Sequence, residues 1–160
     1  MKKAKKAQAW GFDLMVAAII FMFGVFAFYL YSINQGDSEE IINSLSSDGK
    51  LVASFILSEG FPEDWSLTNV AKIGILTGSR INETKLESFF TLSAADYNKA
   101  KSLLNTKYNY YFFLDENLTI AGNQVEGIGL KPTSSQNLIK TTRFTIYKEK
   151  PVTAYLYTWN

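Results

Sequence analysis

The sequence contains no cysteine and no histidine among its 160 residues. Without cysteine the chain has no disulfide framework, although an extracellular domain would permit one. Without histidine it lacks the commonest general base and the commonest metal ligand of proteins. These absences exclude Ser–His–Asp and Cys–His catalysis and the usual zinc sites, and glycine-rich phosphate-binding loops are missing too. We therefore expect no enzymatic activity, no cofactor and no metal.

Carboxylate pairs are the remaining candidates for acid–base chemistry. Three pairs of adjacent acidic residues occur, each at a predicted helix start or turn, where acids are common for structural reasons. The triplet Asp115-Glu116-Asn117 also lacks the ligand spacing of a calcium-binding loop. An enzyme therefore ranks third among the functional hypotheses. The pairs are Glu39-Glu40, Glu63-Asp64 and Asp115-Glu116.

Charge of either sign is scarce overall but unevenly placed. Residues 1–13 carry four lysines and one aspartate, a net charge of +3, and the rest carries 12 basic and 14 acidic residues, a net charge of −2, which together give the formal +1. A mildly acidic C-terminal part has no electrostatic reason to bind nucleic acid. We expect no nucleic-acid partner.

The chain is organised around the run Leu14–Ile33, LMVAAIIFMFGVFAFYLYSI, which contains no charged residue. Twenty helical residues span about 30 Å, the thickness of the hydrocarbon core of a bilayer. Lysines precede the run and acids follow it, so we predict a single-pass cell-membrane protein with a cytoplasmic N-terminus and an extracellular C-terminal domain. The alternative is a cleaved secretory signal peptide, but the run is long for one and no small-residue cleavage site follows it.

The segment KKAQAWGFD, residues 5–13, stands directly before this run. It resembles a class III (type IV prepilin) signal peptide in its archaeal form. The resemblance implies that a prepilin peptidase recognises Lys5 and Lys6 and cuts between Ala7 and Gln8. It divides the chain into a basic leader (1–7), a hydrophobic transmembrane and assembly helix (8–35) and an extracytoplasmic α+β globular domain (36–160).

The chain departs from the bacterial pattern at two positions. Bacterial prepilins place glycine before the cut, where this chain has Ala7, a residue that archaeal forms accept. They also place an acidic residue fifth after the cut, whereas Asp13 is sixth. If Asp13 acts as the assembly acid, it pairs with the new amino group of Gln8 on its own or a neighbouring chain. The alternative is that Asp13 only faces the cytoplasmic interface.

The resemblance implies a filament subunit whose partners are membrane lipid, the prepilin peptidase, and copies of itself or other pilins. Removing the leader removes the lysines that hold the N-terminus at the cytoplasmic face. The helix can then leave the bilayer and bury its apolar surface against sister helices. Small residues offer weakly patterned faces for close helix contact, namely Ala17, Ala18, Gly24 and Ala27.

The outer domain is predicted to begin with a second helix. Asn34-Gln35-Gly36 should interrupt the first helix, and Asp37 with Glu40 forms a capping box for a new one. Gly49 would kink or weaken this helix, and Gly60 would end it. Apolar residues recur at helical spacing and should pack on a sheet, namely Ile41, Ile42, Leu45, Val52, Phe55 and Ile56.

The next segment carries a fainter resemblance. The sequence GFPEDW, followed by the strand 70–76 and a Lys-Leu helix over 84–90, resembles a segment of archaeal pilin-like and related membrane-tethered proteins. We expect Pro62 to fix a turn and Trp65 to fill the end of the core. A ligand-stacking role for Trp65 is the alternative. A capping box at Ser93–Asp96 predicts a further helix through Leu104.

The last third of the chain reads as strands. Residues 108–114 hold five aromatic side chains and should form a buried strand, with weaker strands at 118–120 and 124–130 around a turn at Gly122-Asn123. Residues 138–147 and 152–159 should form a hairpin across Lys148–Pro151. The predicted fold class is α+β: a long hydrophobic helix continues into an amphipathic helix that packs on a small antiparallel sheet, as in pilins.

Two N-x-S/T sequons lie in the predicted extracellular domain, at Asn82 and Asn117. N-glycosylation at both is topologically allowed. Asn82 has a competing role as a helix cap and Asn117 as a turn residue. The leading hypothesis is a type IV pilin-like structural subunit for adhesion, motility or assembly. The alternative is an uncleaved single-pass protein whose outer domain binds a sugar or peptide through its aromatic strands.

Overall fold

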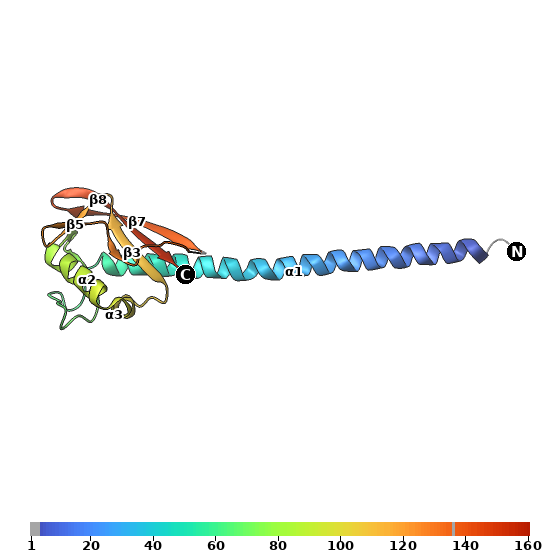
Figure 1. Ribbon diagram of the computed structural model, residues 1–160, viewed down its shortest axis with the longest axis horizontal. Helices are drawn as coiled ribbons and strands as arrows, with labels where there is room; N and C mark the ends of the chain where they lie inside the picture. Colours follow the sequence, from blue (N-terminus) through green and yellow to red (C-terminus); the bar gives the residue numbers. More distant parts are fainter. Residues whose placement is uncertain (1–3, 136) are drawn as a thin grey trace. The chain divides into compact units, whose positions relative to one another are not determined.

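The computed structural model describes residues 4–135 and 137–160, with side chains from Gly11 onward except those of residues 34–38. The chain forms two compact units, Met1–Ile41 and Ile42–Asn160. It is an α+β protein with a long apolar N-terminal helix and further helices packed on a curled, mixed sheet (Figure 1). The predicted fold class is confirmed.

Helix α1 runs without interruption over Ala4–Ile56 and so belongs to both units. The predicted break at Asn34-Gln35-Gly36 is wrong, and no new helix begins at Asp37. Asparagine and glycine each lower helix propensity by no more than about 1 kcal/mol. Helix propagation adds one backbone hydrogen bond for each residue fixed. Helical turns on either side can therefore continue the hydrogen-bonded helix through these three residues.

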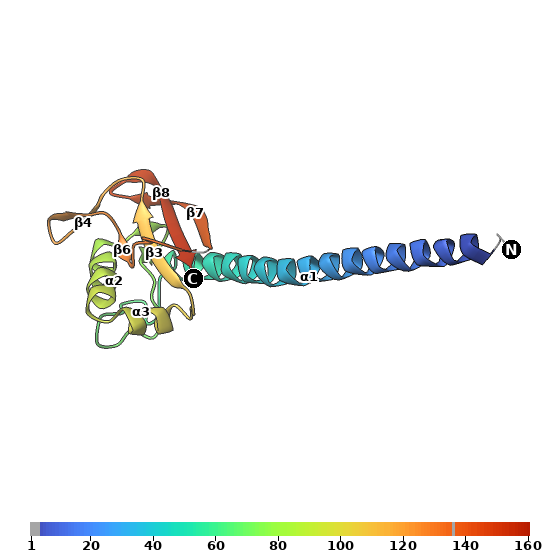
Figure 2. The ribbon, with the colours of Figure 1, turned by 45° about the vertical axis from the view of Figure 1, so that its right-hand side comes forward.

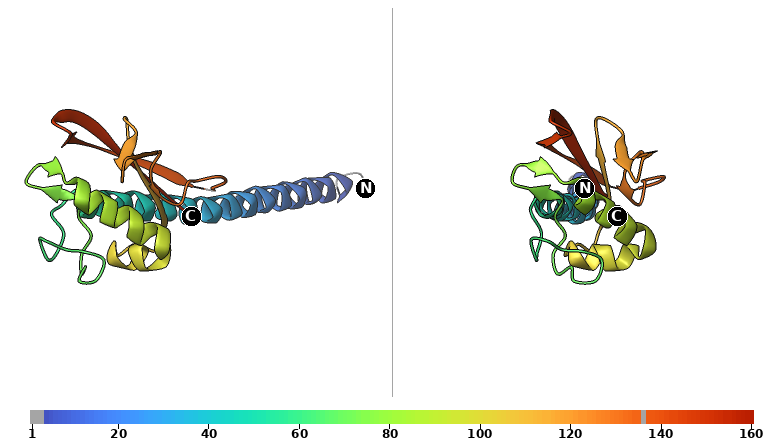
Figure 3. Two further views of the ribbon diagram at one scale, coloured as in Figure 1. Left: turned by 60° about the vertical axis from the view of Figure 1, so that its left-hand side comes forward. Right: turned by 90° about the vertical axis from the view of Figure 1, so that its left-hand side faces the viewer.

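The second unit contains the last turns of α1 and ten further elements. Its helices lie on one side of the sheet (Figures 1 and 3). In chain order the elements are β1 (Leu76–Thr77), β2 (Arg80–Ile81), α2 (Glu83–Ala95), α3 (Tyr97–Leu103), β3 (Asn109–Leu114), β4 (Leu118–Ile120), β5 (Asn123–Val125), β6 (Ile128–Gly129), β7 (Leu138–Tyr147) and β8 (Lys150–Trp159).

Six strands form the main sheet in the order β1-β2-β7-β8-β3-β6, and β4 and β5 form a separate hairpin (Figure 2). The pairs formed by the long strands are antiparallel, as predicted. Strand β2 instead pairs parallel to β7 through Arg80 and Ile146. The sheet is therefore mixed. Parallel strands need a long connection, and the chain between β2 and β7 is long enough because it includes α2 and α3.

The β7–β8 hairpin is the longest ladder of the sheet. Its register extends from Leu138 opposite Trp159 to Tyr147 opposite Lys150. The turn uses only Lys148 and Glu149, with φ of 49° and 64°, and is thus tighter than the predicted turn. Two consecutive positive φ values match the right-handed twist of the flanking strands. The Glu149 carboxylate also accepts a hydrogen bond from the Arg80 guanidinium, which links the turn to β2.

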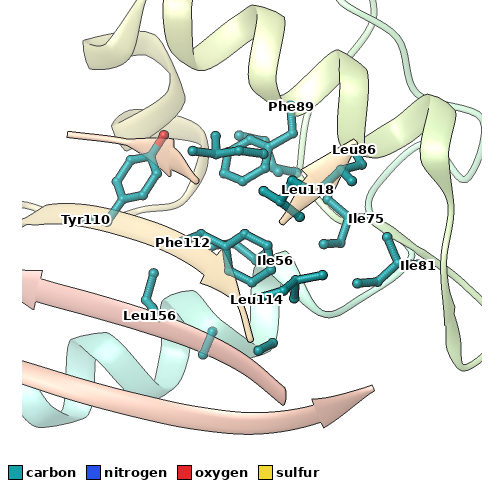
Figure 4. Packing of buried hydrophobic residues seen from close by; sticks show 14 of the residues in the cluster. Ile56, Ile75, Ile81, Leu86, Phe89, Tyr110, Phe112, Leu114, Leu118 and Leu156 are labelled. Carbon is teal, nitrogen blue, oxygen red and sulfur yellow. The ribbon is translucent and has the colours of Figure 1, made fainter. Parts of the chain in front are cut away.

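The core lies between α1, α2 and the inner face of the sheet. Figure 4 shows Phe89 of α2 directed toward Tyr110 and Phe112 of β3, with Ile56 of α1 and Leu156 of β8 close by. The rings of Phe89 and Tyr110 stack with centroids 6.1 Å apart. Strand β8 alternates in burial from Val152 to Tyr157, and its inward residues there are all buried: Val152, Ala154 and Leu156.

Gly49 of α1 is a packing residue in this core. A β-carbon at this position would lie 2.8 Å from Oγ1 of Thr158 and 3.1 Å from Oγ1 of Thr141. The helix stays regular there, so the predicted kink is absent. Glycine lets the helix approach β7 and β8 closely. Of the predicted helix face, Leu45, Val52 and Ile56 are buried, whereas Ile41 and Ile42 are exposed.

The segment between α1 and β1 is mostly irregular, so the predicted strand at 70–76 is wrong except for Leu76. Its residues Ile73 and Ile75 are nevertheless fully buried. Trp65 is 4% exposed, and its Nε1 donates a hydrogen bond to the carbonyl oxygen of Gly74 at 2.7 Å. The core role predicted for Trp65 is confirmed, and its burial excludes ligand stacking.

Lys85 holds this segment against α2. Its side chain is buried, and Nζ donates to the carbonyl oxygens of Glu59 and Leu76, both at 2.8 Å. We expect Lys85→Met to destabilise the second unit by about 2–4 kcal/mol, because two partly buried carbonyl oxygens lose a charged donor. Thermal unfolding of the full chain in phospholipid nanodiscs, followed by near-UV circular dichroism, measures this loss. Lys99→Met, which removes an exposed lysine of α3, should leave the midpoint unchanged.

The helices α2 and α3 are separated by Asp96, the last residue of the predicted capping box. Helix α2 continues through Ser93 to Ala95, and Asp96 is the N-cap of α3, where its side chain accepts from the amide of Lys99 at 2.9 Å. The prediction that Ser93 opens a helix is wrong. The Ser93 hydroxyl is instead buried and hydrogen-bonded to the Tyr110 hydroxyl at 2.9 Å. Ser93 thus bonds to Tyr110 in the core and does not cap a helix.

Candidate functional site

The apolar part of α1 is the first candidate site. Gly11–Ile33 form 23 helical residues with a mean hydropathy of 2.4, and none of them is buried. By length and composition this segment is able to cross a membrane or to serve as a signal sequence. The large apolar side chains of this segment are between 39% (Val16) and 72% (Phe21) exposed.

An energy estimate shows that this segment would gain stability in an apolar environment. Burying one large apolar side chain contributes about 1.5–3 kcal/mol. Sixteen such side chains between Phe12 and Ile33 are exposed, so their removal from water is worth tens of kcal/mol. A folded domain has a net stability of only about 5–15 kcal/mol. The segment therefore has the character of a membrane anchor or a signal sequence.

Gly24 lies in the middle of this segment with open space around it. A β-carbon there would meet nothing within 4 Å, so neither backbone conformation nor packing within the described chain requires glycine. Positions 17 and 24 are seven residues apart and share one helix face, with Asp13 one turn before Ala17 on the same face. This face permits close approach of another helix.

The predicted processing site lies at the start of α1. The backbone of Lys5, Lys6, Ala7 and Gln8 is helical, and their side chains lie outside the described residues. Asp13 is exposed near the start of the apolar segment and makes no hydrogen bond or ion pair within the described part of the chain. Its assembly role and its interfacial role both stay predictions.

The two sequon asparagines differ in their surroundings. Asn82 is the N-cap of α2, as predicted: its side chain accepts from the Lys85 amide at 3.1 Å and donates to Oγ1 of Thr77 at 3.1 Å. Asn117 is exposed, and its Nδ2 donates to Oε1 of Gln124 at 3.1 Å. Glycosylation of either stays a prediction, and the more accessible acceptor is Asn117.

The described residues also bear on metal binding. Among residues 4–135 and 137–160, no three acidic side chains converge as metal ligands. One carboxylate of the predicted acid pairs has a structural partner: Oδ2 of Asp115 accepts from the amide of Thr153 at 3.1 Å. This contact joins the end of β3 to β8, in agreement with the structural interpretation of that pair.

A second candidate site lies on the outer face of the sheet, on the aromatic strands for which the sequence suggested sugar or peptide binding, although the sequence did not locate the pocket. A hollow of about 320 Å³ there is lined by aromatic, apolar and charged side chains. Phe113 and Tyr157 form an aromatic wedge, with ring centroids 5.0 Å apart and an interplanar angle of 61°. The remaining lining residues come from β3 and from both sides of β6: Tyr111, Glu126, Lys131 and Pro132.

The register of the sheet explains how this aromatic pocket forms. Tyr111 lies opposite Tyr157, and Phe113 lies opposite Tyr155, so four rings gather on two neighbouring strands. Alternation along β3 sends Tyr110 and Phe112 to the core and these residues to the other face. Lys140 of β7 covers Tyr155, with Nζ 3.8 Å from the ring centroid. This arrangement leaves Phe113 and Tyr157 to line the hollow.

Comparisons with known proteins found no similarity: no family model matches this sequence, and searches of curated proteins and of solved structures produced no match. The order of elements, a long apolar helix followed by an α+β unit, is compatible with a pilin-like architecture.

Proposed function

We propose that this chain is a type IV pilin-like subunit of a cell-surface filament. The observation that carries the proposal is the apolar segment Gly11–Ile33, which is exposed around its whole circumference and preceded by a lysine-rich start. A buried core helix would have one covered face, and none of these residues is covered within the described chain. A structural subunit needs an apolar surface that first sits in lipid and later in a bundle of sister helices.

The proposed pathway has three steps. The chain inserts with its N-terminus in the cytoplasm, because the lysines before the segment stay on that side. A prepilin peptidase then cuts between Ala7 and Gln8 and removes all four leader lysines. The trimmed helix exchanges lipid for copies of itself or of other pilins, with Asp13 placed to pair with the amino group of Gln8. The outer unit then serves adhesion, motility or assembly through packing.

A second candidate function is an uncleaved anchor that presents a binding domain outside the cell. The aromatic pocket on the outer sheet face is the observation that favours it, because a purely structural subunit has no need of a hollow lined by aromatic side chains. The two functions differ in the fate of the leader, and they agree on the tethered topology.

Processing distinguishes the two functions. In cells that express a prepilin peptidase, we expect Ala7→Leu to retain the leader and to stay in the membrane, whereas the unchanged chain enters filaments that can be sheared from the cell surface. The physical reason is that a bulky residue at the cut cannot enter a peptidase site shaped for a small one. The readout is the amount of chain in the sheared fraction.

Ala9→Leu is the matched control, since it adds the same bulk two residues beyond the cut. Carbonate extraction of both variants shows whether membrane insertion is intact. If Ala7→Leu reaches the sheared fraction as efficiently as the unchanged chain, or if the unchanged chain never does, the filament proposal is wrong and the uncleaved anchor remains.

A further inference from the structure

We infer that the aromatic pocket on the outer sheet face binds a neutral oligosaccharide. The pocket lies wholly within the unit Ile42–Asn160, at a distance in sequence from the apolar segment. The inference therefore holds for a filament subunit and for an uncleaved anchor alike.

The first step concerns the apolar floor. Phe113 and Tyr157 meet at 61°, and Tyr111 lies 5.6 Å from Phe113, measured between ring centroids. The faces of aromatic rings carry a negative quadrupole, which attracts the positively polarised C–H bonds of an opposing group. One face of a pyranose ring presents such C–H bonds. Pro132 adds a rigid apolar wall beside this floor.

The second step concerns a tyrosine hydroxyl that reaches solvent and has no partner within the described part of the chain. Tyr111 is only 8% exposed, and its hydroxyl makes no hydrogen bond within the described part of the chain. Burial raises the pKa of this hydroxyl, so it remains protonated and able to donate. A ligand that covers this hydroxyl has to replace its hydrogen bonds to water, because covered tyrosine hydroxyls usually have a hydrogen-bond partner. A ligand hydroxyl in the pocket would supply one.

The third step concerns charge at the rim. Glu126 and Lys131 form an ion pair there, so the rim carries both signs and no net charge. A phosphate or sulfate group would meet the Glu126 carboxylate, and a cationic group would meet Lys131. Both side chains can still exchange hydrogen bonds with neutral hydroxyls, since each has several donor or acceptor sites. The rim thus favours a polar, uncharged ligand.

These three features together select the ligand class. A purely aliphatic ligand would leave the Tyr111 hydroxyl unsatisfied, and a nucleotide would bring negative charge to Glu126. An oligosaccharide presents apolar C–H faces and hydroxyl-rich edges, which match the aromatic floor and the polar rim. A hollow of about 320 Å³ also lies within the size range of small-molecule sites.

The test uses the full chain in phospholipid nanodiscs, because glycoside detergents would compete for the pocket. Neutral tetrasaccharides of glucose, mannose, galactose and N-acetylglucosamine are titrated by calorimetry, with sialylated and sulfated tetrasaccharides as charged comparisons. We expect at least one neutral tetrasaccharide to bind. We expect Phe113→Ala to weaken this binding by about tenfold or more, because the ligand loses one ring to stack on and the pocket loses its shape.

Two further variants keep the result decisive if Phe113→Ala perturbs the fold. Tyr111→Phe removes only the hydroxyl and should weaken binding about threefold to tenfold, the effect of one hydrogen bond. Phe144→Ala removes an aromatic side chain that is 85% exposed on β7 and does not line the pocket, so it should bind as the unchanged chain does. Thermal unfolding confirms that each variant is folded.

Three outcomes would overturn the inference. The first is that no neutral tetrasaccharide binds. The second is that binding is insensitive to both Tyr111→Phe and Phe113→Ala. The third is that charged tetrasaccharides bind equally well, which would mean that surface lysines rather than the pocket are responsible.

Discussion

Gly74→Ala is expected to prevent the second unit from folding. A β-carbon at this position would lie 2.5 Å from the carbonyl oxygen of Ser58 and 2.7 Å from Cα of Gly60, and closer still to the backbone nitrogen of Gly60. All three are backbone atoms and cannot rotate away. Because Gly74 also accepts the hydrogen bond of the buried Trp65, any shift of its backbone breaks that contact. We expect a loss of at least about 3 kcal/mol.

Limited proteolysis and near-UV circular dichroism of the full chain in nanodiscs measure this effect. We expect rapid cleavage between residues 57 and 76 and a loss of the tryptophan signal. Gly78→Asn is the matched control, because Gly78 has a φ of 60°, which asparagine tolerates, and has open space around it. That variant should lose less than about 1 kcal/mol. A Gly74→Ala variant as stable as the control would disprove this packing of the segment 57–76.

Gly24→Leu is expected to abolish assembly and to leave membrane insertion intact. Leucine is at least as apolar as glycine and is a better helix former by up to about 1 kcal/mol, so insertion and helicity should be preserved or improved. Its side chain would instead occupy the space that a neighbouring helix needs for close contact. We expect the sheared filament fraction to fall by at least about tenfold, a coupling of about 1.4 kcal/mol or more.

The control for this variant is Val25→Leu, which also ends in leucine but lies about 100° around the helix from Gly24. It should assemble as the unchanged chain does. Carbonate extraction confirms that both variants are inserted. Normal assembly of Gly24→Leu would show that the Asp13–Ala17–Gly24 face makes no close helix contact, and the filament proposal would lose this support.

Local sequence patterns predicted the elements whose stabilising contacts are near in sequence. The apolar run, α2, β3 and the β7–β8 hairpin all follow from periodicity and turn chemistry. Trp65 was correctly placed in the core because a large aromatic side chain between two helices has few other stable positions. These predictions required no knowledge of distant contacts.

The errors arose where tertiary contacts override local preference. Ser93 has the pattern of an N-cap, but its hydroxyl finds a buried partner in Tyr110, 17 residues away. Gly49 suggests a weakened helix, but it is required by Thr141 and Thr158, which come from the end of the chain. The parallel pairing of β2 with β7 joins residues 66 positions apart and has no local signature.

The sequence suggested binding by the aromatic strands but did not locate the aromatic pocket, for a related reason. Five aromatic residues lie between Tyr108 and Phe113, and this density predicted a strand that is buried on both faces or nearly so. Only the register of β3 with β8 shows that Phe113 meets Tyr157, and only the return of the chain through β6 brings Glu126 and Lys131 to the rim. A pattern along one strand does not contain this information.

The mass of the intact chain, purified from its native membrane and from surface filaments, tests the central claim most directly. We expect the filament-derived chain to begin at Gln8, so that all four leader lysines are gone and the apolar segment is free to pack against sister helices. A chain that still carries Met1 or Lys2 and is found solely as a lipid-embedded monomer would contradict the proposed function.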